Sequence, residues 1–182
     1  SRGDLWIGTT RYGLRRISGD TGIITPVNVD TSPFKLNDPF VTCICEDKSG
    51  NMLVGSNNSG VQVLNTGDGR DAVLSADFST LANATICAIV PDVKGNLWIS
   101  SAIGLYRRDA ETGELARFTT ADGLPSTQMN LSSWHVSDDG EIYFGTVNGL
   151  FSFRPEKILP AYPRIAPVRI IKVTANGKEL YP

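Results

Sequence analysis

A short glycine-led phrase occurs four times along this 182-residue chain. The four copies start 47, 45 and 45 residues apart and occupy Gly3–Thr9, Gly50–Ser56, Gly95–Ser101 and Gly140–Thr146. This period is longer than that of leucine-rich or ankyrin repeats and is typical of a four-stranded propeller blade. The sequence therefore predicts a run of blades.

Glycine-marked turns divide each copy into short strands. A second glycine, followed by an apolar residue, comes nine or ten residues after the first, at Gly13, Gly60, Gly104 and Gly149. Glycine supplies the positive φ that tight turns need, so each copy is expected to open with a hairpin. A third turn, which the fourth copy lacks, leads into a strand ending near Val27, Phe78 or Phe118; its three copies are Asp20-Thr21-Gly22, Asn65-Thr66-Gly67 and Glu111-Thr112-Gly113.

The innermost strand of each blade is predicted just before the phrase, at residues 41–45, 86–90 and 131–135. Both alternating faces of these segments carry apolar or small residues, as expected of strands packed between neighbouring blades. The phrase itself holds a large residue at one repeated position, interpreted as blade packing rather than ligand stacking: Trp6, Leu53, Trp98 and Tyr143. The predicted fold class is all-β, a partial β-propeller of about four four-stranded antiparallel blades over residues 1–155. By this count the blades have three, four, four and about three strands.

A second unit is predicted over residues 156–182. The glycine rhythm stops after Phe153, and four prolines between Pro155 and Pro167 indicate a linker because proline disrupts strand pairing. Residues 168–173 then have the pattern of a new strand, followed by a turn at Ala175-Asn176-Gly177-Lys178. The first copy has no innermost strand before Gly3, as expected of a piece of a larger ring.

Composition excludes two classes of partner. The chain has 17 Lys and Arg against 19 Asp and Glu, with no basic stripe, so a nucleic-acid partner is not expected. No apolar run approaches the ~18 residues that span a bilayer, and no signal-like segment stands at the amino end. The prediction is a globular segment without a membrane segment of its own.

The third copy carries a family resemblance. Lys94-Gly95-Asn96-Leu97-Trp98-Ile99, Gly104-Leu105-Tyr106-Arg107, Glu111-Thr112-Gly113-Glu114, Phe118-Thr119 and Asp122-Gly123-Leu124-Pro125 together resemble the two-component-regulator propeller repeat. The resemblance covers residues 1–155, with Leu53 in place of the tryptophan in the second copy and Ser100 in place of glycine in the third. Residues 163–181 resemble the start of the small Ig-like domain that follows such propellers.

The resemblance implies a sensor. This repeat builds the periplasmic region of inner-membrane-anchored hybrid two-component systems, best known from Bacteroides-type gut bacteria, in which a glycan-derived ligand is signalled to a histidine kinase. On this interpretation the segment itself is not an enzyme and needs no cofactor. Two alternatives stay open: a fragment of a propeller lyase or hydrolase, and a protein-interaction scaffold.

Catalytic and metal chemistry find little support in the residues. The chain has one histidine, His135, at the position held by Cys45 and Val90 in the neighbouring copies, so a packed core histidine is expected rather than a metal ligand or general base. A nucleophilic pair of Cys45 and His135 would lack an orienting third group. Cys43 and Cys45 share a strand face while Cys87 aligns with Thr42 on the other, so three buried free thiols and no disulfide are expected.

Ligand contacts are predicted in the loops between the second and third strands, since the strands are committed to packing. The weak candidates are Arg11, Tyr12, Asn57, Asn58 and Asn148, beside Ile103 and the longer connections at 35–38, Asn83 and 122–128. These side-chain types hydrogen-bond to sugars or stack on them. The alternative is that the asparagines occupy turns because asparagine tolerates positive φ.

An incomplete ring has two further consequences. A pocket at the mouth of a propeller draws on blades all round it, so this segment alone is expected to bind an oligosaccharide weakly or not at all. Bare blade faces are rare on stable monomers, so self-association as a dimer or larger assembly is expected.

Overall fold

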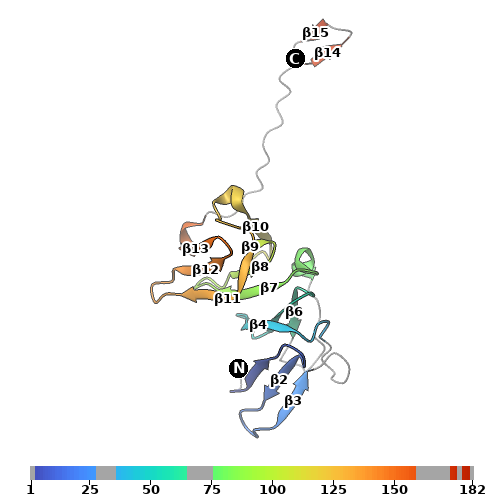
Figure 1. Cartoon of the computed structure of the whole chain (residues 1–182), viewed down its shortest axis with the longest axis vertical. Helices are drawn as coiled ribbons and strands as arrows, with labels where there is room; N and C mark the ends of the chain where they lie inside the picture. Colours follow the sequence, from blue (N-terminus) through green and yellow to red (C-terminus); the bar gives the residue numbers. More distant parts are fainter. Residues whose placement is uncertain (1–2, 28–35, 65–75, 159–172, 176–177, 181–182) are drawn as a thin grey trace.

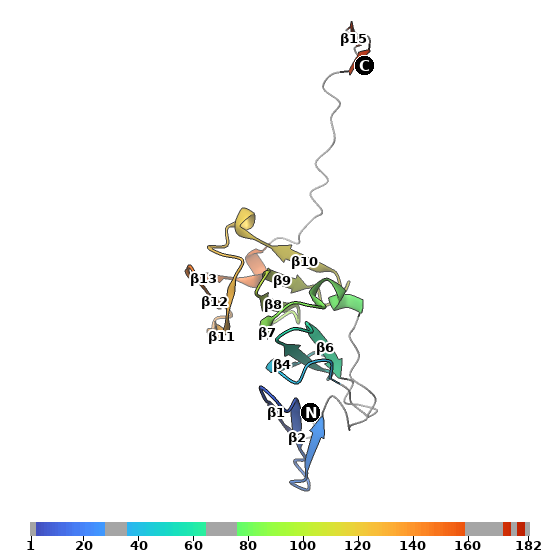
Figure 2. The same ribbon diagram turned by 45° about the vertical axis from the view of Figure 1, so that its right-hand side comes forward.

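The computed structural model describes residues 3–27, 36–64, 76–158, 173–175 and 178–180. Within these residues the chain forms four consecutive antiparallel blade sheets, which follow one another in chain order in both views (Figures 1 and 2). The predicted all-β propeller fold is confirmed.

The first two blades each contain three described strands in sequential order. Those of the first blade are β1 (Leu5–Gly8), β2 (Leu14–Ile17) and β3 (Ile24–Val27). Those of the second are β4 (Val41–Glu46), β5 (Met52–Ser56) and β6 (Val61–Leu64). The segment predicted to be innermost is β4, which pairs with β5 as expected.

The third blade is the four-stranded one, and the fourth has three strands. The third consists of β7 (Ile86–Pro91), β8 (Leu97–Ser101), β9 (Gly104–Arg108) and β10 (Leu115–Phe118). A 3-10 helix, η2 (Thr120–Asp122), capped by Thr119 and ended by left-handed Gly123, leads to the fourth. That blade consists of β11 (Met129–Val136), β12 (Ile142–Thr146) and β13 (Gly149–Phe153).

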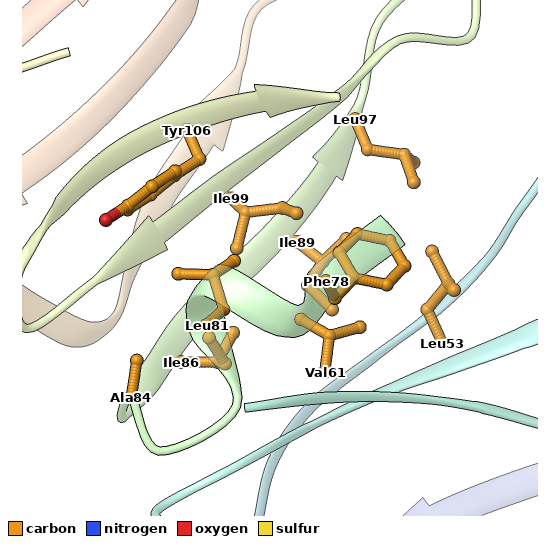
Figure 3. Packing of buried hydrophobic residues seen from close by; sticks show 10 residues of the cluster. All are labelled: Leu53, Val61, Phe78, Leu81, Ala84, Ile86, Ile89, Leu97, Ile99 and Tyr106. Atoms are coloured by element: carbon orange, nitrogen blue, oxygen red, sulfur yellow. The ribbon is translucent and has the colours of Figure 1, made fainter. Parts of the chain in front are cut away.

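The end predicted for one strand is helical instead. Phe78, expected at the end of a fourth strand in the second blade, lies in the 3-10 helix η1 (Ala76–Leu81); the predicted turn at Asn65-Thr66-Gly67 lies outside the described residues. The physical reason is burial: Phe78 and Leu81 are three residues apart, and a 3-10 helix places such residues on one side. Both side chains are buried between the second and third blades, packed with Val61 and Ile89 (Figure 3). An extended strand would have turned one of them toward solvent.

Three apolar clusters join the blades pairwise, and the second and third sheets are buried on both faces. Met52 and Val54 of β5 pack toward the first blade with Leu14 and Val27, whereas Leu53 packs toward the third. Trp98 of β8 faces the fourth blade, where it meets Ile142 and Phe144. The packing role predicted for Leu53 and Trp98 is confirmed. Trp6 is only partly buried against the second blade, and Tyr143 is half-buried on the outward face of the fourth.

A hydroxyl closes the same turn in all four blades. The phrase ends in Ser or Thr, and its side-chain O–H donates to the carbonyl of the glycine beyond the turn: Thr9 to Gly13 (2.8 Å), Ser56 to Gly60 (3.1 Å), Ser101 to Gly104 (2.9 Å) and Thr146 to Gly149 (2.9 Å). All four glycines have positive φ, so the predicted need for glycine there is confirmed. The hydroxyl was visible as the last letter of the phrase, but its role was not predicted.

The chain after β13 is described in two pieces. The 3-10 helix η3 (Pro155–Lys157) follows the last blade strand. Farther on, β14 (Val173–Ala175) and β15 (Lys178–Leu180) form an antiparallel hairpin. Of the predicted strand at 168–173, only Val173 lies within the described residues, and the predicted turn residues Asn176 and Gly177 lie outside them. The division of the chain near residue 155 and the Ig-like start stay predictions.

Candidate functional site

The candidate ligand residues are carried by one edge of the blade arc. We call this edge the loop face; it consists of the β1–β2, β5–β6, β8–β9 and β12–β13 loops. Backbone hydrogen bonds tie these loops to the connections between blades, as where the Asn57 N–H donates to the Phe40 carbonyl (3.1 Å). The Thr85 hydroxyl in turn donates to the Asn57 carbonyl (2.6 Å). The loop face is therefore held by the blades behind it.

The candidates differ in how much of each side chain is available. Arg11 and Tyr12 are exposed. The Asn58 N–H donates to the buried carboxylate of Asp38 (2.8 Å), and Asn58 itself is exposed. The Asn148 side-chain amide donates to the Pro125 carbonyl (3.3 Å), so one of its groups is already engaged.

Positive φ does not explain the asparagines. Among the described residues, Ser132 is the only non-glycine with positive φ. Asn57, Asn58 and Asn148 therefore do not occupy their turns through positive φ. Hydrogen bonds stabilise these turns instead. Ligand binding by these residues stays a prediction.

A shallow hollow on the loop face lies beside η1. Its volume is about 190 Å³, and its lining includes Ser79, Asn83 and Ile103. Asn83 and Ile103 came from different predicted loops, and the fold brings them together. Polar groups beside an apolar wall suit a small hydroxylated ligand.

A larger cavity lies at the opposite end of the third blade. Its volume is about 300 Å³, and its lining includes Lys94, Arg107, Asp109, Glu156 and Ile158. Sequence reasoning missed this site. A signal was available in the repeat alignment. Arg107 pairs with Trp98 in the third blade, and the apolar Val63 pairs with Leu53 at the same position of the second. The alignment therefore places a cation at a position that packs blades together.

Arg107 is the buried charge of this cavity. Its guanidinium carbon lies 6.0 Å from the ring centroid of Trp98, and Nη2 lies 3.8 Å from Oδ2 of Asp109. Its Nε–H has no hydrogen-bond partner among the described residues. The backbone N–H groups of Thr112 and Glu111 lower the pKa of Asp109, which keeps that carboxylate ionised beside the arginine.

His135 is not the core residue that the sequence predicted. It lies exposed on β11, paired with Tyr143 of β12, with the two rings 6.1 Å apart. The equivalent Cys45 and Val90 are covered by the next blade, whereas the described residues place no blade beyond this face. Cys45 packs toward the third blade and His135 points outward from the fourth, so the proposed nucleophilic pair does not form.

The three cysteines are free thiols of low reactivity. Burial raises the pKa of Cys43 to about 12 and those of Cys45 and Cys87 to about 11, so all three stay protonated at neutral pH. A thiolate is the nucleophilic form, so these residues behave as small apolar groups. The expected absence of a disulfide is confirmed.

The described residues have neither a metal-binding cluster nor a membrane-spanning helix. No group of three or more His, Cys, Asp or Glu side chains in them is arranged to hold a metal ion. Their helices are all too short or too polar to cross a membrane.

One copy of the repeat matches a known family model. The family model described as "Two component regulator propeller" matches residues 35–58, which include the whole second phrase. The chain carries the two-component regulator propeller repeat. The other three copies share the register and the turn-closing hydroxyl of the matched copy.

Two proteins similar to this chain have names from two-component signalling. "Histidine kinase P4" of Formosa agariphila is 31% identical over 74 residues, which is 41% of this chain and 5% of that protein. The extracellular domain described as part of a hybrid two-component system from B. thetaiotaomicron has a TM-score of 0.64 at 18% identity. That match covers 86% of this chain and 20% of the solved one, so the chain spans a small part of these relatives.

The same propeller fold also occurs in an enzyme. Virginiamycin B lyase from Staphylococcus aureus has a TM-score of 0.56 at 17% identity, covering 85% of this chain and 53% of the lyase. At this identity the likeness concerns the fold alone. The described residues present no catalytic constellation of their own.

Proposed function

We propose that this chain is part of the sensor region of a hybrid two-component signalling protein. The observation that carries the proposal is the two-component regulator propeller repeat, matched at residues 35–58 in a phrase that occurs four times in one register. The fold resembles an extracellular domain of a hybrid two-component system. The histidine kinase relative supports the same interpretation. On this proposal the segment recognises a signal, and a kinase elsewhere in the full protein provides the output.

The same relationship supports an extracytoplasmic location. The solved relative is an extracellular domain. We place this segment in the periplasm, as part of a protein anchored in the inner membrane. Binding there changes the output only if the ligand prefers one arrangement of the sensor over another.

The proposed ligand is an oligosaccharide, recognised on the loop face. Arg11 and Tyr12 offer an exposed guanidinium and an exposed aromatic ring within one loop, a combination that can hydrogen-bond to a sugar and stack on it. Neighbouring loops contribute Asn57, Asn58 and Asn148. The hydroxyl groups of a sugar could accept hydrogen bonds from the arginine and the asparagine amides, and donate to the asparagine carbonyl oxygens.

The test compares the complete sensor region with this segment. Calorimetry with a panel of plant and host oligosaccharides is expected to give clear binding to the complete region, and weak or no binding to residues 1–182 alone. Tyr12→Ala in the complete region is expected to weaken binding by about tenfold, the loss of one stacking contact.

Val93→Ala provides the control, since Val93 is exposed in the β7–β8 turn, at the opposite end of the blade from the loop face. The glycan proposal would be contradicted if the complete region bound none of the oligosaccharides and if the kinase output of the cell also did not change when they were added. Micromolar binding by the isolated segment would contradict the incomplete-ring argument.

We also propose that the isolated segment self-associates through the outward face of the first blade. Leu5 and Ile24 are 58% and 62% exposed there, although the residues equivalent to Leu5 in the other blades are buried. Light scattering after size exclusion is expected to give a mass above 19.6 kDa that falls on dilution. Leu5→Lys should shift the distribution toward monomer, whereas Val93→Lys, in an exposed turn, should not. A concentration-independent monomer would refute this proposal.

A further inference from the structure

The cavity at the base of the third blade is assembled from three separate segments. Lys94 comes from the β7–β8 turn, Asp109 and Glu111 from the β9–β10 turn, and Glu156 and Ile158 from the segment at η3. These turns lie at the opposite end of the sheet from the β8–β9 loop. The cavity is therefore separate from the loop face, and a ligand bound in it does not depend on the proposed function.

Arg107 forms the buried base of the cavity and has an unsatisfied donor. Its side chain is only 10% exposed, and no hydrogen bond from the described residues satisfies its Nε–H. Its ionic neighbour, Asp109, stands 3.8 Å away, beyond hydrogen-bonding distance. A buried guanidinium is normally paired and hydrogen-bonded, because leaving its donors unsatisfied is costly. The Nε atom itself is covered by the protein, so a ligand in the cavity would pair with the terminal N–H groups of the guanidinium, which match a carboxylate in charge.

The mouth of the cavity has the opposite charge. Glu111 and Glu156 are exposed at the rim with Lys94, and Asp109 stands between rim and base. The lining therefore has two cations and three carboxylates, with the best-buried charge positive. Pro155 and Ile158 add an apolar wall, and Ile158 packs against the apolar cluster between the third and fourth blades.

We propose that this cavity binds a small zwitterion of the α-amino acid type. The carboxylate of the ligand pairs with the Arg107 guanidinium, its ammonium group donates to the carboxylates at the mouth, and an apolar side chain lies against Pro155 and Ile158. A cavity of about 300 Å³ is at the lower end of the range for small-molecule sites and suits a ligand of this size.

Two other ligand classes fit less well. A simple anion would satisfy Arg107 but would add a negative charge to a lining that already has more carboxylates than cations. A neutral sugar would leave the guanidinium without a charged partner at hydrogen-bonding distance, because Asp109 stands 3.8 Å away. A zwitterion places its negative group beside the arginine and its positive group beside the carboxylates.

The indole N–H of Trp98 provides a direct readout, because the ring lies beside Arg107 and its N–H donates to Asp92 (3.1 Å). We would follow this signal by NMR, assigned through Trp98→Phe, while adding L-valine, N-acetyl-L-valine, L-valinamide or sulfate. L-Valine is expected to give a saturable shift. The N-acetyl compound and the amide, each lacking one charge, should bind at least about tenfold more weakly.

Variants separate the two ends of the ligand. Arg107→Met is expected to abolish the L-valine shift, whereas Arg117→Met, on the neighbouring strand and outside the cavity lining, should preserve it. If Arg107→Met unfolds, Glu156→Gln at the exposed rim still tests the proposal, since it should weaken L-valine but not N-acetyl-L-valine. Equal shifts from sulfate and L-valine, or no shift from any probe, would overturn the zwitterion site.

Discussion

Replacing Trp98 with alanine is expected to lower the free energy of unfolding by about 3–5 kcal/mol, the usual cost of removing a large aromatic side chain from a core. The ring is 1% exposed and joins two blades: its centroid lies 4.4 Å from that of Phe153 and 5.6 Å from that of Phe118. The substitution would also remove the indole N–H bond to Asp92. Urea denaturation followed by circular dichroism measures the change.

Trp134→Ala is the matched control. Trp134 pairs with Phe144 within the fourth blade and is 47% exposed, so its loss should cost about 1 kcal/mol or less. Comparable losses from the two substitutions would show that the third and fourth blades are not joined through Trp98.

Gly60→Ala is expected to cost at least about 3 kcal/mol, because two penalties add at one position. Gly60 has φ +65°, where an L side chain is strained, and a Cβ there would stand 2.0 Å from the carbonyl oxygen of Leu81. That oxygen belongs to the backbone at the end of η1, so the second and third blades would have to move apart. The denaturation midpoint of the variant measures the effect.

Gly22→Ala isolates the first of these penalties. Gly22 has φ +68°, yet a Cβ there would meet nothing within 4 Å. Its substitution should therefore cost only about 1–2 kcal/mol, the strain of the left-handed conformation. If the two alanine variants were equally stable, the close approach of Leu81 to Gly60 would not constrain the fold.

The repeat made most of the fold predictable from sequence. The spacing of the phrase located the blades, and the apolar segments before it located β4, β7 and β11, because these signals are local and occur several times. Phe78 was misplaced because a single apolar residue in an irregular connection does not reveal whether its chain is extended or turned. Its environment is set by Val61 and Ile89 on neighbouring blades.

The candidate site was less predictable, since it depends on which face of a blade is covered. His135 shares its position with Cys45 and Val90, and the alignment alone made all three core residues. His135 is exposed because no described blade covers its face, and the sequence of its own blade does not show this. Arg107 shows the converse: its burial comes from being in an inner blade, so a charged residue lies at the base of a cavity.

The hydroxyl that closes the turn in every blade has a consequence for how such chains grow. Its bond runs from Ser56 to Gly60, or from Thr146 to Gly149, entirely within one repeat. A duplicated repeat therefore arrives with its turn already stabilised, and only the side chains on its two faces have to adapt to new neighbours. Natural variation in blade number should accordingly leave the Ser or Thr and the glycine of this turn unchanged while the facing residues diverge.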